Sequence, residues 1–77
     1  MLDKYRSCFA EAFEIEPGSA DVLEYQSIDN WDSVGHMSLM SLLEEKFDIV
    51  LDMDDIIDFA SFKKGIEILS KYGVNIE

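Results

Sequence analysis

Apolar residues recur at helical spacing at the start of the chain, and polar residues largely occupy the positions between them. Such a pattern places the apolar side chains on one face of a helix. The residues on this face are Leu2, Tyr5, Phe9, Ala12 and Phe13. The pattern predicts a first helix over residues 3–14, which ends before the turn-forming pair Pro17-Gly18.

A long connection rich in turn-forming polar residues follows this helix. We expect Ser19 to cap a short helical turn that runs through Leu23. Several apolar residues are available to hold the connection against the core. They are Ile15, Val22, Leu23, Tyr25 and Ile28.

The clearest helical pattern begins after Asp32 and predicts a second helix that extends to Phe47. Its apolar residues recur every three or four positions, and Leu39 and Leu42 widen the apolar face. The residues that we expect to face the core are Val34, Met37, Met40, Leu43 and Phe47.

Two further helices are expected after the second one. Residues 48–52 include β-branched apolar residues, but an isolated strand would have no partner, so we expect a loop there. Residues 54–59 are typical of a short helix, with acidic residues at its positive end. Ser61 begins a last helix, which Gly73 ends. Its inward residues are Phe62, Ile66, Leu69 and Tyr72.

These elements predict an all-α fold, a small antiparallel bundle of three main helices plus one short helix. Residues 1–77 are expected to form a single domain, since no internal linker, repeat or low-complexity segment interrupts them. We expect the aromatic residues, the four methionines and the single cysteine, Cys8, to lie in the core.

The charge of the chain favours basic protein partners. Its 17 Asp and Glu residues against 6 Lys and Arg give a net charge of −11, which repels nucleic acids and anionic membrane surfaces. No Lys or Arg occurs between Ser7 and Glu45. The chain has no segment of transmembrane length and no apolar stretch typical of a signal peptide at its start. We therefore expect a cytoplasmic monomer that does not insert into membranes.

The residue types of a serine triad occur together as Asp32, Ser33 and His36. An aspartate adjacent to the serine is poorly placed to orient the imidazole, so we expect no catalysis and an exposed His36. The acidic residues 52–58 lack the spacing of a calcium-binding loop, and one cysteine with one histidine cannot form a structural zinc site. We therefore expect no metal site.

Ser33 stands at the start of the second helix, where either it or Asp32 would cap the backbone. A helix N-terminus also favours a phosphate group, because its free N–H groups and dipole attract negative charge. Four features together resemble the acyl carrier protein family over nearly the whole chain. They are the Asp32-Ser33-Val34 step, the apolar helix after it, the run from Glu44 to Ile49 and the acidic segment Asp54-Asp55-Ile56.

The resemblance implies a carrier without catalytic activity of its own. Ser33 would hold 4'-phosphopantetheine covalently, transferred from coenzyme A by a phosphopantetheinyl transferase, with Asp32 and Val34 beside it. The thiol of this arm would carry acyl intermediates as thioesters, as in fatty acid or polyketide biosynthesis. A tethered intermediate reaches successive partner enzymes at high effective concentration.

The resemblance also implies that acyl-loading and acyl-using enzymes dock through basic surfaces. The expected docking residues are Glu44, Glu45, Asp48, Asp54, Asp55 and Asp58. Val34 and Met37 would add apolar contact beside the arm where they are exposed, although we expect Met37 to be buried.

Gly35 and Ser38 occupy positions that are often acidic in carriers of fatty acid synthesis, which favours a specialised biosynthetic pathway. Gly35 would also allow close approach of the arm or of a partner. Two alternatives stay open. One is a peptidyl (aminoacyl) carrier of nonribosomal synthesis, and the other is a non-carrier acidic interaction module in which Ser33 is only a cap.

Overall fold

Helices joined by loops make up the described part of the chain, as the apolar periodicity predicts. The computed structural model describes residues 1–76, and the all-α bundle is confirmed there. Its elements are α1 (Leu2–Phe13), the 3-10 helix η1 (Pro17–Val22), α2 (Ser33–Phe47), α3 (Met53–Asp58) and α4 (Phe62–Ser70). Each predicted main helix is therefore present, and most of the helix ends lie within one or two residues of the predicted ends.

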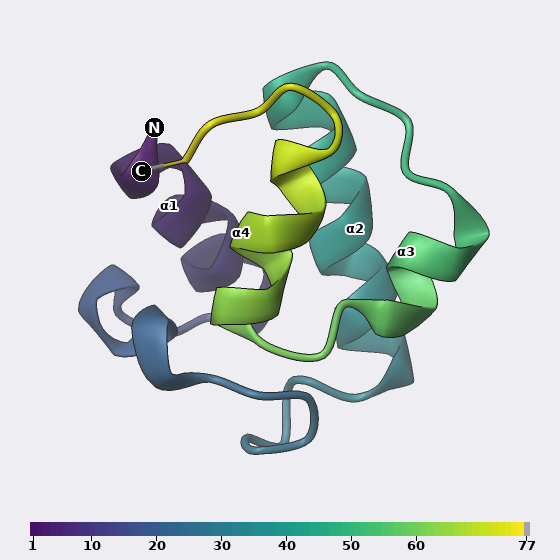
Figure 1. Cartoon of the computed structure of the whole chain (residues 1–77). Helices are drawn as coiled ribbons and strands as arrows, with labels where there is room; N and C mark the ends of the chain where they lie inside the picture. The colour runs from purple at the N-terminus through teal and green to yellow at the C-terminus, as the bar shows by residue number, and fades with distance from the viewer. Residues whose placement is uncertain (77) are drawn as a thin grey trace.

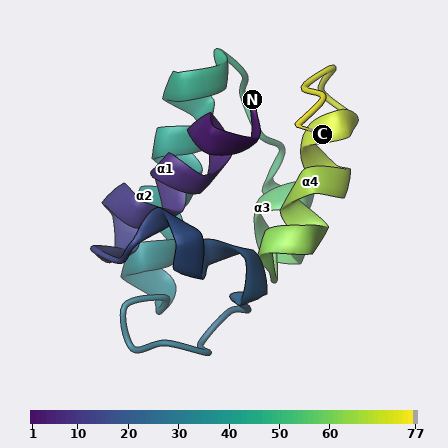
Figure 2. The same ribbon diagram turned by 90° about the vertical axis from the view of Figure 1, so that its left-hand side faces the viewer.

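The three longer helices surround the core (Figure 1). α1 runs in the opposite direction to α2, whereas α4 runs in the same direction as α2 because α3 and its flanking loops carry the chain back across the bundle. Figure 2 shows the long connection, which includes η1, passing beneath one end of α1 and α2. α3 lies to the side, next to α2 and α4.

An aromatic cluster centred on Phe9 joins the helices. The Phe9 ring lies 5.0 Å from the Tyr5 ring, 5.7 Å from the Trp31 ring and 5.2 Å from the Phe62 ring, between centroids. Tyr5 and Trp31 are fully buried, and the Tyr5 hydroxyl donates a hydrogen bond of 2.6 Å to the carbonyl of Phe62. Because these contacts connect residues far apart in sequence, the cluster holds α1, α4 and the long connection together.

Polar side chains stabilise the helix starts and the long connection. The Asp32 carboxylate accepts a hydrogen bond from the Gly35 N–H, and the Ser61 hydroxyl accepts one from the Lys64 N–H. Arg6 forms a bidentate ion pair with Asp21 at 2.7 and 2.8 Å, which attaches η1 to α1.

Two expectations for the long connection are wrong. Ser19 does not cap η1, which instead begins at Pro17, a residue suited to the first turn of a helix. Val22 is 83% exposed rather than packed on the core, although Leu23 is buried as expected. Ile15 and Ile28 also pack against the core as expected. Backbone hydrogen bonds to the start of α4, from Phe62 to Leu23 and from Tyr25 to Ala60, add to these contacts.

The expected inward face of α2 is also partly wrong. Val34 is 76% exposed and Met37 is 51% exposed, while the fully buried residues of α2 are Leu39, Met40 and Leu43. Met1 and Met53 are exposed too, so Met40 alone among the methionines is in the core. In the first half of α2, apolar residues therefore lie on more than one side of the helix, and the neighbouring helices cover only some of them.

We predict that Gly65→Ala destabilises the protein. A Cβ atom at this position would lie 2.1 Å from the Tyr5 hydroxyl oxygen and 2.2 Å from a ring carbon of Phe59. Gly18→Ala is the matched control, because nothing lies within 4 Å of a Cβ atom there. Urea unfolding should show Gly65→Ala to be less stable than Gly18→Ala by about 1–3 kcal/mol, the usual cost of overpacking. Equal stabilities of the two variants would contradict this account of the α1–α4 contact.

Candidate functional site

Ser33 is the first residue of α2, and its side chain is exposed. The Asp32 carboxylate caps the helix through the Gly35 N–H at 2.8 Å, so the Ser33 hydroxyl is not needed for capping. Its nearest polar side-chain contact is a long one, 3.5 Å to the hydroxyl of Tyr25. Ser33 therefore presents a free hydroxyl at the positive end of a long helix.

Two hollows meet at Ser33, one on each side of α2. The first is an open groove of about 710 Å³ between α1 and α2, whose lining includes Glu11, Ala12, Val34, Ser38, Ser41 and Leu42. The second is a cavity of about 380 Å³ between α2, α3 and the long connection. Its lining, apart from Ser33, includes Tyr25, His36, Met53, Ile56, Ile57, Phe59 and Ala60, while Met37 borders both hollows. The cavity is mainly apolar, and its few polar groups lie close to the serine.

His36 lines this cavity and connects three parts of the chain. Its Nδ1 atom accepts a hydrogen bond of 2.9 Å from the indole N–H of Trp31. An indole nitrogen can only donate, so the ring of His36 is neutral with its proton on Nε2. Nε2 then donates a hydrogen bond of 2.7 Å to the carbonyl of Ile56 in α3.

The expectation of an exposed His36 is therefore wrong. The ring is half-buried, stacks on Trp31 and has both nitrogens engaged. With these contacts His36 cannot act as the base of a serine triad, because neither ring nitrogen is free to take a proton from Ser33. Asp32, for its part, caps α2 rather than orienting the imidazole.

Gly35 has an internal role that differs from the expected one. A Cβ atom here would lie 1.9 Å from the carbonyl oxygen of Asn30 and 3.2 Å from the ring of Phe13. Asn30 is itself held at this place, because its side-chain amide donates a hydrogen bond of 2.7 Å to the carbonyl of Phe13. The glycine therefore lets the loop before Ser33 pack closely against α2, and no arm or partner is needed to explain it.

Five of the six acidic residues expected to meet partners are at least partly accessible. Glu45, Asp48, Asp54 and Asp58 are exposed, and Glu44 is half-buried. The Glu44 carboxylate accepts a hydrogen bond of 2.8 Å from the Leu51 N–H, so it stabilises the loop between α2 and α3.

Asp55 is the exception, since it is 7% exposed and engaged within the protein. Lys71 and the Tyr72 hydroxyl both donate hydrogen bonds to its carboxylate. The pKa of Asp55 lies below its ordinary value of 3.8. The largest cause is the hydrogen bond from Lys71, and the second is the hydrogen bond from Tyr72. Asp55 is therefore less suited to docking than the exposed carboxylates, because its charge is already paired with α4 and the turn after it, and its docking role stays a prediction.

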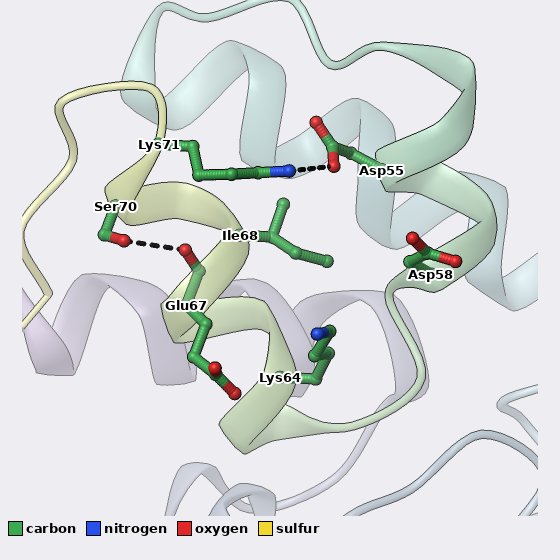
Figure 3. Close-up of a pocket in the computed structure, with 7 residues that line it drawn as sticks. All are labelled: Asp55, Asp58, Lys64, Glu67, Ile68, Ser70 and Lys71. Atoms are coloured by element: carbon green, nitrogen blue, oxygen red, sulfur yellow. Dashed lines mark hydrogen bonds and ion pairs between the residues drawn. The ribbon is translucent and has the colours of Figure 1, made fainter.

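Figure 3 shows this ion pair at the edge of a shallow hollow between α3 and α4. Lys71 extends across Ile68 toward Asp55, and Asp58, Lys64 and Glu67 also line the hollow. Acidic and basic side chains are mixed here, which suits the attachment of α3 to α4. Together with His36 on its other side, this cluster holds α3 as one wall of the cavity beside Ser33.

In the part of the chain that the structure describes, neither the cysteine nor the acidic side chains form a further candidate site. Burial raises the pKa of the Cys8 thiol to about 11, which keeps the sulfur in its unreactive protonated form. Within residues 1–76, no three or more His, Cys, Asp and Glu side chains are arranged to hold a metal ion. No helix in the same range combines the length and the apolar character needed to cross a membrane.

Comparison of the chain with protein-family models, with curated proteins and with solved structures found no match. The fold and site define a small all-α bundle with an exposed serine at the start of its longest helix and an apolar cavity beside it.

Sequence reasoning missed two contributors to this site, Tyr25 and the Trp31–His36 pair. A tryptophan followed by a histidine five positions later was a usable signal, because a buried indole N–H needs an acceptor. Tyr25 had no such signal, since its position near Ser33 depends on how the long connection folds back.

We predict that Asp55→Asn destabilises the protein at pH 7. Because the folded-state pKa of Asp55 is lowered, its ion pair stabilises the fold above the ordinary carboxyl pKa, and this contribution disappears as the pH falls through the folded-state value. The stability difference between wild type and Asp55→Asn should therefore shrink as the pH falls from 7 to below about 4.

Denaturant unfolding at a series of pH values measures this difference. Asp58→Asn, a change at an exposed position of the same helix, is the control and should show a smaller difference at pH 7. A difference for Asp55→Asn that stays constant down to pH values where carboxylates are protonated would contradict the role of this ion pair.

Proposed function

We propose that this protein is an acyl carrier protein that holds acyl intermediates as thioesters on a 4'-phosphopantetheine arm attached to Ser33. The observation that carries the proposal is the free, exposed hydroxyl of Ser33 at the start of α2, released from capping by Asp32 and bordered by an apolar cavity. The Asp32-Ser33-Val34 step and its position relative to the helices support the same conclusion.

The chemistry of attachment suits this position. The Ser33 oxygen would form a bond to the phosphorus that bears the pantetheine group, while the pyrophosphate bond of coenzyme A breaks and adenosine bisphosphate leaves. The hydroxyl proton would pass to a base of the phosphopantetheinyl transferase. The resulting phosphodiester keeps a negative charge, which a helix N-terminus stabilises by about 0.3–1 kcal/mol.

The lining of the α2–α3 cavity favours an apolar acyl group over an aminoacyl group as the cargo. Met53, Ile56, Ile57 and Phe59 offer no charged partner for an ammonium group. An apolar chain that entered the cavity would be removed from water, which is favourable in proportion to the area buried. The exposed Val34 and Met37 beside the serine would meet apolar surface around a partner's active-site entrance.

We predict that Ser33→Ala abolishes arm attachment. Incubation of the wild-type protein with coenzyme A and a broad-specificity phosphopantetheinyl transferase should add one arm, seen by intact mass spectrometry. Ser38→Ala and Ser41→Ala are matched controls, because both serines lie on α2 beside the same groove as Ser33 and both variants should still be modified. Modification of Ser33→Ala, or an unmodified wild-type chain, would refute the proposal, and the second outcome would favour a non-carrier interaction module.

We also predict that acidic residues at the exposed surface of α2 and α3 direct docking of basic partners. Glu45→Lys and Asp58→Lys, singly and combined, should slow acyl transfer from the loaded protein to a partner enzyme, since these residues are exposed and acidic. The effect should decline between about 0.01 and 0.1 M salt, as the Debye length falls from about 30 to 10 Å.

The control for docking is Glu16→Lys, which makes the same charge change just before η1. The segment that contains η1 lies on the side of the molecule away from α3 (Figure 1). Glu44 and Asp55 are left unchanged because their carboxylates hold the loop and α3 in place. Equal slowing by the Glu16 and Glu45 variants would indicate that net charge, rather than this surface, governs the encounter.

A further inference from the structure

Tyr25 makes contacts with three other residues although its side chain is partly exposed. Its backbone N–H donates a hydrogen bond of 2.8 Å to the carbonyl of Ala60, at the start of the α4 segment. Its ring meets the Trp31 ring edge-on at 6.4 Å and the His36 ring edge-on at 5.5 Å, between centroids. These contacts place the Tyr25 hydroxyl 3.5 Å from the Ser33 hydroxyl, and both residues line the α2–α3 cavity.

A group attached to Ser33 has two directions open to it. Ser33 borders both the α1–α2 groove and the α2–α3 cavity, and the groove is the larger of the two. Tyr25 borders the cavity only. A hydrogen bond donated by Tyr25 to a group on Ser33 therefore favours the path into the cavity over the path into the groove.

We propose that Tyr25 is a positioning residue that directs the arm on Ser33 into the α2–α3 cavity. This inference rests on the proposed function. The Tyr25 hydroxyl donates a hydrogen bond to a phosphate oxygen on Ser33, and this contact turns the rest of the arm away from the α1–α2 groove. Hydrogen bonds to charged acceptors are stronger than neutral ones, so the long contact with the unmodified serine becomes a shorter and stronger one after attachment.

Removal of the hydroxyl isolates this effect, because Tyr25→Phe keeps the ring and its contacts with Trp31 and His36. Loss of a hydrogen bond to a charged group should change the ratio of the two arm orientations by about tenfold. Ser27→Ala is the matched control, since it removes a hydroxyl from the same loop whose contact is with the Glu24 N–H instead of Ser33.

The experiment compares methyl NMR spectra of each variant before and after arm attachment. Met53 and Ile57 report on the cavity, whereas Ala12 and Leu42 report on the groove. In the wild type and in Ser27→Ala, attachment should move the signals of Met53 and Ile57. In Tyr25→Phe those changes should largely disappear and changes at Ala12 and Leu42 should grow, while the phosphorus resonance of the arm moves relative to wild type.

Denaturant unfolding of unmodified Tyr25→Phe checks that the fold is intact. Identical methyl and phosphorus changes in loaded wild type and loaded Tyr25→Phe would overturn the positioning role of Tyr25. So would arm-dependent changes confined to Ala12 and Leu42 in the wild type. Either result requires that the arm is attached, so both differ from failure of the proposed function, in which the wild type takes up no arm.

Discussion

The buried indole N–H of Trp31 is the constraint on which the site depends. The Trp31 side chain is fully buried, and a buried donor without a partner costs about 1–3 kcal/mol. His36 Nδ1 is the partner, which requires a neutral ring with its proton on Nε2. That proton is donated to the carbonyl of Ile56. This chain of two hydrogen bonds, called the polar chain below, thus links the long connection to α2 and α2 to α3.

The polar chain matters because α3 is six residues long and leaves Met53 and Ile57 exposed. Such a short helix is marginal by itself, and it is held here from both sides. His36 binds the carbonyl of Ile56 on one side, and Lys71 binds the neighbouring Asp55 on the other. The cavity beside the serine can therefore keep apolar walls, since polar contacts at its margin hold one of them in place.

Similar acidic residues have different roles in this chain. Asp55 is paired with Lys71, and Glu44 caps a loop N–H, so both contribute to the fold. Glu45 and Asp58 are exposed, and their charges act on solvent and on any approaching molecule. This division separates the carboxylates that set the shape of the site from those available for recognition.

Sequence alone determined the main helices, the all-α bundle and Ser33 as the candidate residue, because apolar periodicity and helix-start signals act over a few neighbouring positions. It did not determine the position of His36, the internal role of Gly35 or the burial of Asp55. Each of these depends on a group supplied by another part of the chain, such as the carbonyl of Ile56 or the ammonium of Lys71. Tertiary packing decides those contacts, since periodicity specifies which side of a helix is apolar but not which distant segment will cover it.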